Sequence, residues 1–456
     1  MTDKMVWNNE KQPRVRFAPS PTGFLHIGGV RTALFNFLFA KKNGGLYYLR
    51  IDDTDKERSK KEYEEEIIAG FQKLGLLWDN KEIIRQSERL ILYKKYLEKL
   101  LTEDKAYISN ETNVKEGERA EVIRLRNPNK KIEFEDLVRG KVVFDTSELG
   151  DFVIAKSLDE PIYHFASVID DLEMAITHVI RAEEHLSNTP RQILIQEAVG
   201  AESPIYAHVP LILAADRSKL SKRQGAVTLK EFLEQGYLPE GIFNYLALLG
   251  WHPADNQEIF SLSELIEAFD LNRVQKGGAI WNTEKLNWVN REHLNKIPNL
   301  QIVIADKIKE VLRLGENKET EIILEKIAPI VLERISKFGD IKEMADRGEL
   351  AYFFQAPEYP KEMLFWKKDK DSSRTYERLV KVREILGGEA SLGGFASKYK
   401  NELLALAEKE GRGEVLWPLR VALSGLEKSP DPFVLLKILG EKEALLRIDK
   451  AINILV

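Results

Sequence analysis

The chain has 456 residues, 43% of them hydrophobic and 31% charged, which is the balance of a globular protein with two to four domains. It contains no cysteine, so disulfides and thiolate metal sites are excluded, and its net charge of −5 neither indicates nor forbids a local basic surface for nucleic acid. No apolar run approaches a membrane span and residues 1–12 hold no apolar core, so we expect a cytoplasmic protein that is neither secreted nor membrane-inserted.

Residues 14–58 predict a strand, a turn, a helix and a second strand. Basic and apolar residues alternate from Arg14 to Ala18, and the sequence PSPTG then breaks the strand. The following apolar residues have the spacing of one buried helix face: Val30, Ala33, Leu34, Phe37 and Leu38. Leu46–Ile51 reads as the second strand, which ends in an acidic stretch that begins with Asp52.

His26, Gly28 and Gly29 fall at the predicted start of this helix. A helix N-terminus offers unpaired N–H groups, glycine lets a phosphate approach closely, and an imidazole can donate a hydrogen bond to a phosphoryl oxygen. Ligands of a β-α-β unit lie at the carboxyl ends of its strands, so Arg16 and Asp52 could face the same crevice. The His-x-Gly pattern alone leaves open an ordinary turn with a solvent-facing histidine.

The next part of the chain predicts packing helices over Lys60–Leu101 and then short β-rich runs at Ala106–Ile108, Val122–Leu125, Gly140–Phe144 and Phe152–Ala155. We interpret the β-rich part as an insertion between two halves of a nucleotide-binding fold. It carries a basic cluster that either contacts phosphates or is a solvated charged face: Arg119, Arg124, Arg126, Lys130 and Lys131.

The second half of the predicted nucleotide-binding fold contains a strand at Ile176–Ile180, followed by charged residues that include Arg181 and Glu184. Proline at position 190 marks a helix start there. Further along, the basic loop SKLSKRQG at 218–225 precedes a helix opened by a capping box from Thr228 to Glu231. A basic loop by itself is usually only solvated. From 238 onward the pattern is almost wholly helical, which also fits a bundle for oligomerisation.

The segments RFAPSPTG, LHIGG and RIDDTD, in this order, resemble the first signature of the class I aminoacyl-tRNA synthetases, and within them the glutamyl-tRNA synthetase family. Lys219-Leu220-Ser221-Lys222-Arg223 is similar to the second signature, the KMSKS-type loop. WPLRVALSG and IDKAINIL also resemble the family, so the likeness covers the chain from Arg14 onward.

The resemblance implies a multidomain protein with an α/β Rossmann-type catalytic domain, an α+β insertion and an all-α anticodon-binding C-terminal part. The implied domains are the first catalytic half at 14–105, the acceptor-binding insertion at 106–160, the second catalytic half with the KMSKS-type loop at 161–237, a helical stem-contact domain at 238–320 and the anticodon-binding domain at 321–456.

The implied activity is that of a glutamate–tRNA ligase. L-Glutamate reacts with ATP, with Mg²⁺, to give glutamyl-adenylate and pyrophosphate, and glutamate then passes to the 3′-terminal adenosine of tRNA-Glu. Members of the family usually need bound tRNA before they activate glutamate, and the resemblance implies the same here.

By position, the resemblance assigns the site residues as follows: His26, Gly28, Gly29, Lys219 and Lys222 to catalysis; His26, Gly28, Glu184, Ile212 and Lys222 to ATP; Arg16, Ala18, Ser20, Asp52, Tyr163 and Arg181 to glutamate; Arg334 to the last anticodon base; and none to a metal site. Arg16 and Arg181 are expected to hold the side-chain carboxylate, because a guanidinium is planar and permanently charged. Asp52 is expected near the α-ammonium.

This chain departs from the family pattern at several positions. Many relatives have glutamate in place of Asp52, so the shorter aspartate leaves room for a bridging water. His185 is tryptophan in some relatives. Some relatives also carry a cysteine-rich zinc knuckle near residues 107–110, which the lack of cysteine excludes here.

Two other functions were weighed against the synthetase. Relatives that glutamylate a modified tRNA base lack the long helical C-terminal part, which this chain has. A non-catalytic tRNA-binding paralogue is disfavoured because His26, Arg181 and Lys222 are retained. Whether tRNA-Gln is also charged is left open, and a monomer is expected by analogy only.

Overall fold

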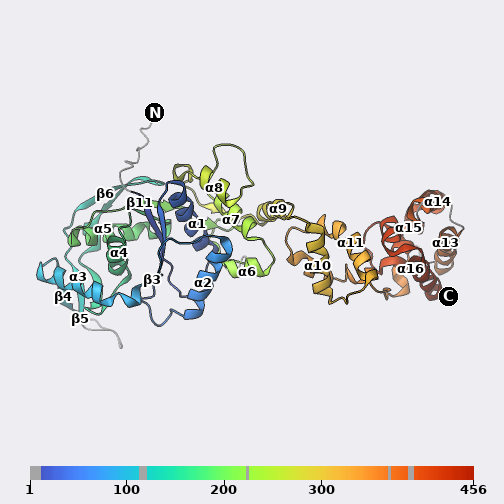
Figure 1. The fold of residues 1–456 in the computed structure, drawn as a ribbon, viewed down its shortest axis with the longest axis horizontal. Coiled ribbons are helices and arrows are strands. Elements are labelled where there is room, and N and C mark those ends of the chain that lie inside the picture. The colour runs from blue at the N-terminus through green and yellow to red at the C-terminus, as the bar shows by residue number, and fades with distance from the viewer. Residues whose placement is uncertain (1–11, 112–120, 222–224, 368–370, 389–394) are drawn as a thin grey trace. The chain divides into compact units, whose positions relative to one another are not determined.

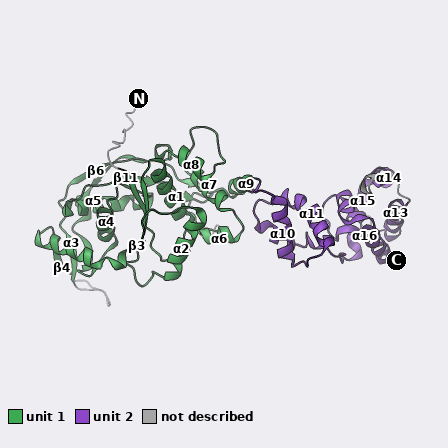
Figure 2. Ribbon diagram, viewed as in Figure 1, with its two compact units in different colours: residues 1–293 green, residues 294–456 purple. Residues whose placement is uncertain are grey.

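The computed structural model describes residues 12–111, 121–221, 225–367, 371–388 and 395–456. The chain divides into two compact units, residues 1–293 and 294–456 (Figure 2). The first unit combines sheets with helices. The described residues of the second unit form helices and irregular segments but no strand (Figure 1). The predicted fold class, an α/β catalytic part followed by an all-helical part, is confirmed.

The centre of the first unit is a parallel sheet. Its strands are β1 (Arg14–Phe17), β2 (Leu46–Ile51), β3 (Ile84–Arg85), β10 (His178–Ala182) and β11 (Ile205–Val209). β2 pairs with both β1 and β3, and β10 pairs with β11, all in parallel. Hydrogen bonds between Arg14 and Thr177 place β10 beside β1. The carboxyl ends of β1 and β10 therefore meet at the crevice where a doubly wound sheet binds its ligands.

Helices cover both faces of this sheet. Side chains of β10 alternate between two hydrophobic clusters, with Ile180 in the cluster of α1 (Ile27–Lys42) and Val179 in the cluster of α4 (Tyr163–Glu173). The remaining helices of the unit are α2 (Lys61–Leu74), α3 (Leu90–Thr102), α5 (Thr189–Val199), α6 (Leu229–Glu234), α7 (Pro239–Leu248), α8 (Leu262–Ala268) and, at its boundary, α9 (Thr283–Leu294).

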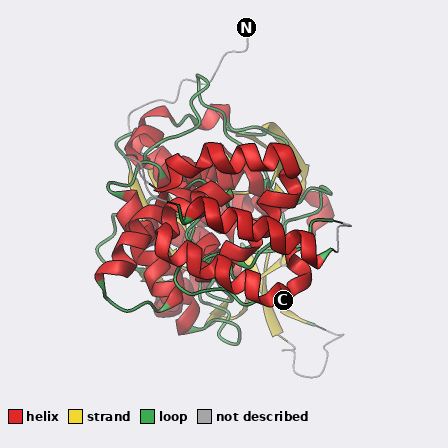
Figure 3. Cartoon of the chain, turned by 90° about the vertical axis from the view of Figure 1, so that its right-hand side faces the viewer, coloured by secondary structure: helices red, strands yellow, loops and turns green. Residues whose placement is uncertain are grey.

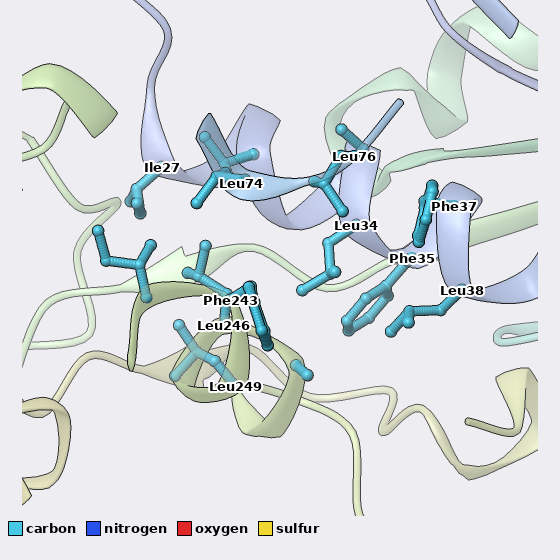
Figure 4. Close-up of a cluster of buried hydrophobic side chains, with 14 of the residues drawn as sticks. Ile27, Leu34, Phe35, Phe37, Leu38, Leu74, Leu76, Phe243, Leu246 and Leu249 are labelled. Carbon is cyan, nitrogen blue, oxygen red and sulfur yellow. The ribbon is translucent and has the colours of Figure 1, made fainter. Parts of the chain in front are cut away.

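The position of α1 is fixed by its packing against α7. Figure 4 shows Leu34 and Phe35 of α1 facing Phe243 and Leu246 of α7. All four side chains are buried, and burial of one such side chain contributes about 1.5–3 kcal/mol. The first turn of α1, which carries the histidine and glycines of interest, is thus held rigidly over the carboxyl end of β1.

The inserted segment contributes strands to two sheets. β4 (Ala106–Asn110), β5 (Glu121–Leu125), β8 (Phe152–Ser157) and β9 (Glu160–Pro161) form an antiparallel sheet. The hairpin of β6 (Lys131–Asp136) and β7 (Gly140–Asp145) instead extends the central fold, because β6 pairs with β11 at Tyr206 and Asp136. The sequence did not predict β6. A short parallel pair, β12 (Ile212–Leu213) with β13 (Ala279–Ile280), completes the strands.

The second unit is a helical array, and none of its described residues is in a strand (Figure 3). Its helices are α10 (Leu300–Leu312), α11 (Lys318–Leu332), α12 (Gly339–Asp346), α13 (Ser372–Leu386), α14 (Phe395–Glu410), α15 (Arg412–Ser424) and α16 (Pro432–Leu455). Buried apolar residues of α13, α15 and α16, such as Leu379, Val421 and Ala451, share one core. Across the described part of the chain, no helix is both long and apolar enough to span a membrane.

Most predicted elements are found close to their predicted positions. β2 has the predicted bounds, and the strand predicted at 176–180 is found as β10, two residues later. Pro190 lies in the first turn of α5, and the Thr228–Glu231 capping box is present at α6. The segment predicted as helical at 60–101 is interrupted by β3, whose two residues are too few to show a period.

Candidate active site

A cavity of about 400 Å³ opens at the carboxyl ends of β1 and β10. It is lined by every predicted catalytic, ATP-binding and glutamate-binding residue that the structure describes, namely Arg16, Ala18, Ser20, His26, Gly28, Gly29, Asp52, Tyr163, Arg181, Glu184, Ile212 and Lys219. Lys222 lies outside the described residues, and Arg334 belongs to the second unit. The structure thus brings segments about 200 residues apart in the sequence to one site, while the role of each residue stays a prediction.

His26 is the N-cap of α1, and its orientation is fixed by the helix that it begins. Its Nδ1 accepts a hydrogen bond from the backbone N–H of Gly28 at 3.0 Å. Burial, and then the positive charge of Lys219, lower the pKa of His26 below its usual value. The ring is therefore neutral near pH 7, with its proton on Nε2. His26 can act as a hydrogen-bond donor at the N-terminus of α1, where the helix dipole is positive.

The first signature segment is joined through its backbone to the residues that follow the basic loop. The N–H of Ile27 donates to the carbonyl of Val227 at 2.8 Å, and the N–H of Leu229 donates to the carbonyl of Leu25 at 3.0 Å. Lys219 reaches Glu184 across the cavity, with 2.5 Å between Nζ and Oε2. Lys219 and the start of α6 are therefore both held close to the first turn of α1.

A buried network of charges forms the floor of the cavity. Arg16 makes two hydrogen bonds to Asp171, at 2.9 and 3.1 Å. Arg50 contacts Asp52 at 2.7 and 3.2 Å and Asp171 at 2.7 Å, and its side chain has no exposed surface. Asp170 lies 3.6 Å from Arg50. These contacts tie β1, β2 and α4 together below the crevice.

The two aspartates that contact Arg50 respond differently to it. Burial outweighs the attraction of Arg50 and raises the pKa of Asp52 to about 6. Burial also acts on Asp171, but the guanidinium groups of Arg16 and Arg50 together hold its pKa below the usual value. Asp52 is the more weakly neutralised carboxylate, so it retains the capacity to attract a cation from the cavity.

Two arginines of the cavity, Arg31 and Arg181, pair with no carboxylate among the described residues. Arg31 donates both terminal nitrogens to the backbone carbonyls of Leu249 and Pro210, so of these two residues the one with an unpaired terminal nitrogen is Arg181. Its Nε donates to Nε2 of His208 at 3.1 Å and its Nη2 donates to Thr189 Oγ1 at 2.9 Å. The residue is only 5% exposed, and its Nη1 is buried without a hydrogen-bond partner. Burial lowers the pKa of Arg181 from its ordinary value. A buried cation with a free donor is a receptor for an anionic group.

Several residues of this site were not predicted from the sequence. Arg50 belongs to the RIDDTD segment but was assigned no role, and Asp170 and Asp171 look like the polar face of a helix, although all three are buried. His208 and Asp136 were also missed, because the hydrogen bond between them joins positions 72 residues apart. The available signal was an acidic pair flanked by the apolar residues Val168, Ile169 and Leu172 in α4.

The predicted RNA-contact residues are paired locally. In the inserted segment Arg124 bonds to Glu111, Arg126 to Asp104 and Lys130 to Glu197. Arg119 lies outside the described residues. In the second unit Arg334 pairs with Glu349 and lines a cavity of about 920 Å³ that also contains Arg347, Arg420 and Lys428. No group of three or more His, Asp or Glu side chains in the described part of the chain is placed to hold a metal ion.

A doubly wound sheet with a histidine-capped helix start, facing a basic loop and followed by a helical unit, is the architecture of a class I aminoacyl-tRNA synthetase. The family model for the catalytic domain of class I tRNA synthetases (E and Q) matches residues 12–121 and 109–288, and a model of the anticodon binding domain matches 303–452. The chain belongs to this class I tRNA synthetase (E and Q) family.

Named relatives are similar over almost the whole chain. Glutamate–tRNA ligase 2 of Thermoanaerobacter pseudethanolicus is 41% identical over 96% of this chain and 98% of its own length. The glutamate–tRNA ligase of Aquifex aeolicus is 40% identical over 90% and 93%. The crystal structure of a glutamate tRNA ligase from Elizabethkingia meningosepticum in complex with its amino acid has a TM-score of 0.82 and 36% identity, covering 97% of this chain and 99% of that one.

The substitution Arg50→Met tests the buried charge network. It removes a cation that contacts both Asp52 and Asp171, so uncompensated carboxylates remain in the interior. We expect the free energy of unfolding of the first unit to fall by about 3–5 kcal/mol, measured by urea denaturation of the full chain. Arg58→Met is the control, because it removes only an exposed pair with Asp55 and should cost less than about 1 kcal/mol. Equal, small losses in both variants would contradict this role of Arg50.

Proposed function

We propose that this protein is a glutamate–tRNA ligase. It activates L-glutamate with ATP and transfers the glutamyl group to the 3′-terminal adenosine of tRNA-Glu. The observation that carries the proposal is the buried guanidinium of Arg181, which has a free Nη1 and no carboxylate partner among the described residues. The family match leaves glutamate and glutamine as candidate substrates, and a buried cation favours the carboxylate of glutamate over the neutral amide of glutamine.

The amino acid lies between two charges in this proposal. Its side-chain carboxylate binds Nη1 of Arg181, and its α-ammonium lies toward Asp52, directly or through a water. Tyr163 and Ser20 line the same cavity. Arg16 is already held by two bonds to Asp171, so it contributes less than Arg181 to carboxylate binding.

ATP then lies along the first turn of α1. The first turn of α1, with His26, Gly28 and Gly29, is proposed to lie next to the phosphates, and Ile212 and Glu184 line the same cavity. Lys219 lies close to the same helix start, and Lys222, outside the described residues, is proposed to neutralise charge on the leaving pyrophosphate. Mg²⁺ is proposed to enter bound to the oxygens of the triphosphate, because that ion is usually held through substrate phosphates.

The chemistry needs positioning rather than a protein nucleophile. A glutamate α-carboxylate oxygen attacks the α-phosphorus of ATP, and the bond to pyrophosphate breaks. A terminal ribose hydroxyl of tRNA then attacks the carbonyl carbon of the glutamyl-adenylate, and AMP leaves. His26, as a neutral donor, stabilises the charge that develops on the phosphoryl oxygens.

The second unit is proposed to bind the tRNA anticodon, with Arg334 at the last anticodon base. The anticodon-binding match over 303–452 supports this proposal and disfavours a tRNA-base-modifying relative, which would lack this part. We further propose that the enzyme works in the cytoplasm as a monomer.

Arg181→Gln tests the glutamate site. The change keeps a polar side chain but removes the cation, so the KM for glutamate should rise about 10- to 150-fold, given about 1.5–3 kcal/mol for a hydrogen bond to a charged group. The KM for ATP should stay within about twofold, in aminoacylation assays with saturating tRNA-Glu. Arg85→Gln, which removes an arginine paired with Glu64 outside the cavity, should change neither constant. An unaltered KM for glutamate in Arg181→Gln would exclude the proposed site.

His26→Asn tests the phosphate-facing donor. The asparagine Oδ1 can accept the Gly28 N–H as Nδ1 does, but no donor replaces Nε2–H. We expect kcat of glutamate-dependent ATP–pyrophosphate exchange, with tRNA present, to fall by about 10²- to 10³-fold. His26→Ala also loses the N-cap, so it alone should lower stability by about 0.5–2 kcal/mol. A normal exchange rate in His26→Asn would rule out this role.

A further inference from the structure

A second layer of side chains lies behind Arg181. His208 has no exposed surface, does not line the cavity and accepts the Nε–H of Arg181 through its Nε2 at 3.1 Å. Its Nδ1 lies 2.6 Å from Oδ2 of Asp136. Asp136, His208 and Arg181 thus form a continuous line of hydrogen bonds from β6, through β11, to the end of β10.

The hydrogen bonds fix the tautomer of His208. Because Arg181 can only donate, Nε2 of His208 must be the acceptor, and the ring proton is then on Nδ1, where it is donated to Asp136. Burial is the first cause of a lowered pKa for His208, although the bond to Asp136 acts in the opposite direction. The ring is therefore neutral. A ring with the proton on Nε2 would place two donors against each other.

Asp136 is itself held in one orientation. Its Oδ1 accepts the backbone N–H groups of Val138 at 2.9 Å and Arg139 at 2.8 Å, and its Oδ2 accepts the N–H of His208 at 3.1 Å. The residue is 1% exposed. A carboxylate with so many donors cannot rotate away from the imidazole.

This arrangement differs from that at Arg16, where Asp171 contacts the guanidinium directly. A carboxylate touching Arg181 would compete with an anionic ligand. With a neutral imidazole between them, Asp136 stabilises the cation at a distance and leaves Nη1 free. The bond to His208 and the bond to Thr189 occupy two nitrogens of the rigid fork, so its third nitrogen has a defined direction.

We propose that Asp136 and His208 are positioning residues that orient Arg181 and thereby help this enzyme to select glutamate over glutamine. The proposal rests on the proposed function of the cavity. It assigns to the inserted segment, through Asp136 on β6, a part in amino-acid selection.

Two substitutions at position 208 separate the two bonds of the ring. His208→Asn places an amide nitrogen where Nδ1 was and keeps the bond to Asp136, but leaves the Nε–H of Arg181 without an acceptor. His208→Gln places an amide oxygen where Nε2 was and keeps the acceptor for Arg181, but loses the donor to Asp136. Steady-state aminoacylation with the full chain and tRNA-Glu compares the variants.

We expect His208→Asn to raise the KM for glutamate about tenfold, to leave the KM for ATP within about twofold, and to lower the ratio of kcat/KM for glutamate to that for glutamine about tenfold. His208→Gln should rescue the KM for glutamate to within about threefold of the parent value. The control is His178→Asn, which changes a histidine of β10 that is 1% exposed and packs against Phe39, and it should alter none of these constants.

Asp136→Asn is the second test and keeps the inference falsifiable if a His208 variant does not fold. Its amide nitrogen would face Nδ1 of His208, so the ring proton moves to Nε2. That proton then opposes the Nε–H of Arg181, and the KM for glutamate should rise by at least as much as in His208→Asn.

Equal rises in the KM values for glutamate and ATP, or no change in either, would overturn the inference. If Arg181→Gln raises the KM for glutamate while His208→Asn and Asp136→Asn do not, only the positioning role fails. If Arg181→Gln has no effect, the proposed glutamate site fails with it.

Discussion

The site depends on a buried positive charge that the protein leaves without a direct counter-ion. Taking a guanidinium out of water costs several kcal/mol unless hydrogen bonds and an opposite charge compensate. Around Arg181 the protein supplies neutral acceptors from His208 and Thr189, and the ring of Tyr206 lies 5.5 Å from the guanidinium. Compensation for the lost hydration of the guanidinium is therefore incomplete until an anion enters the cavity. A bound carboxylate supplies the missing opposite charge.

The same cavity contains the opposite solution at Arg16 and Arg50. There, aspartates contact the guanidiniums directly, and the network links β1, β2 and α4 into one floor. Arg16 and Arg50 thus stabilise the shape of the crevice, whereas Nη1 of Arg181 is left without a partner and available for a ligand. The packing of α1 against α7 holds the start of α1 in place beside this cavity (Figure 4).

Local sequence signals account for the parts of the fold that were predicted. β2 has a clear apolar run between a glycine pair and aspartates, α1 has a complete apolar face, and α6 has a capping box. β6 was missed because acidic residues alternate with its apolar ones in a short segment, and its pairing partner β11 lies about 70 residues later. Strand pairing across such a separation leaves no local mark in the sequence.

In the candidate site, too, residues with local sequence signals were predicted and residues without them were missed. The family resemblance identified Arg181, His26 and other residues that line the cavity, since each lies at a strand end or a helix start. The resemblance assigns Arg16 and Arg181 the same role, whereas the structure distinguishes them: Arg16 is bonded to Asp171 and Arg181 is not. Because Asp171 is 155 residues away from Arg16, this difference could not be predicted from the local sequence. His208 and Asp136 carry no motif, and only their contact in space reveals them.

The most direct measurement is transfer of labelled amino acid to purified tRNA by the full chain with ATP. Labelled glutamate should be attached to tRNA-Glu, and labelled glutamine to neither tRNA-Glu nor tRNA-Gln. Attachment of glutamate to tRNA-Gln as well would define a non-discriminating enzyme with the same chemistry. Attachment of glutamine, or of neither amino acid, would contradict the assignment of Arg181 as the receptor of a glutamate carboxylate.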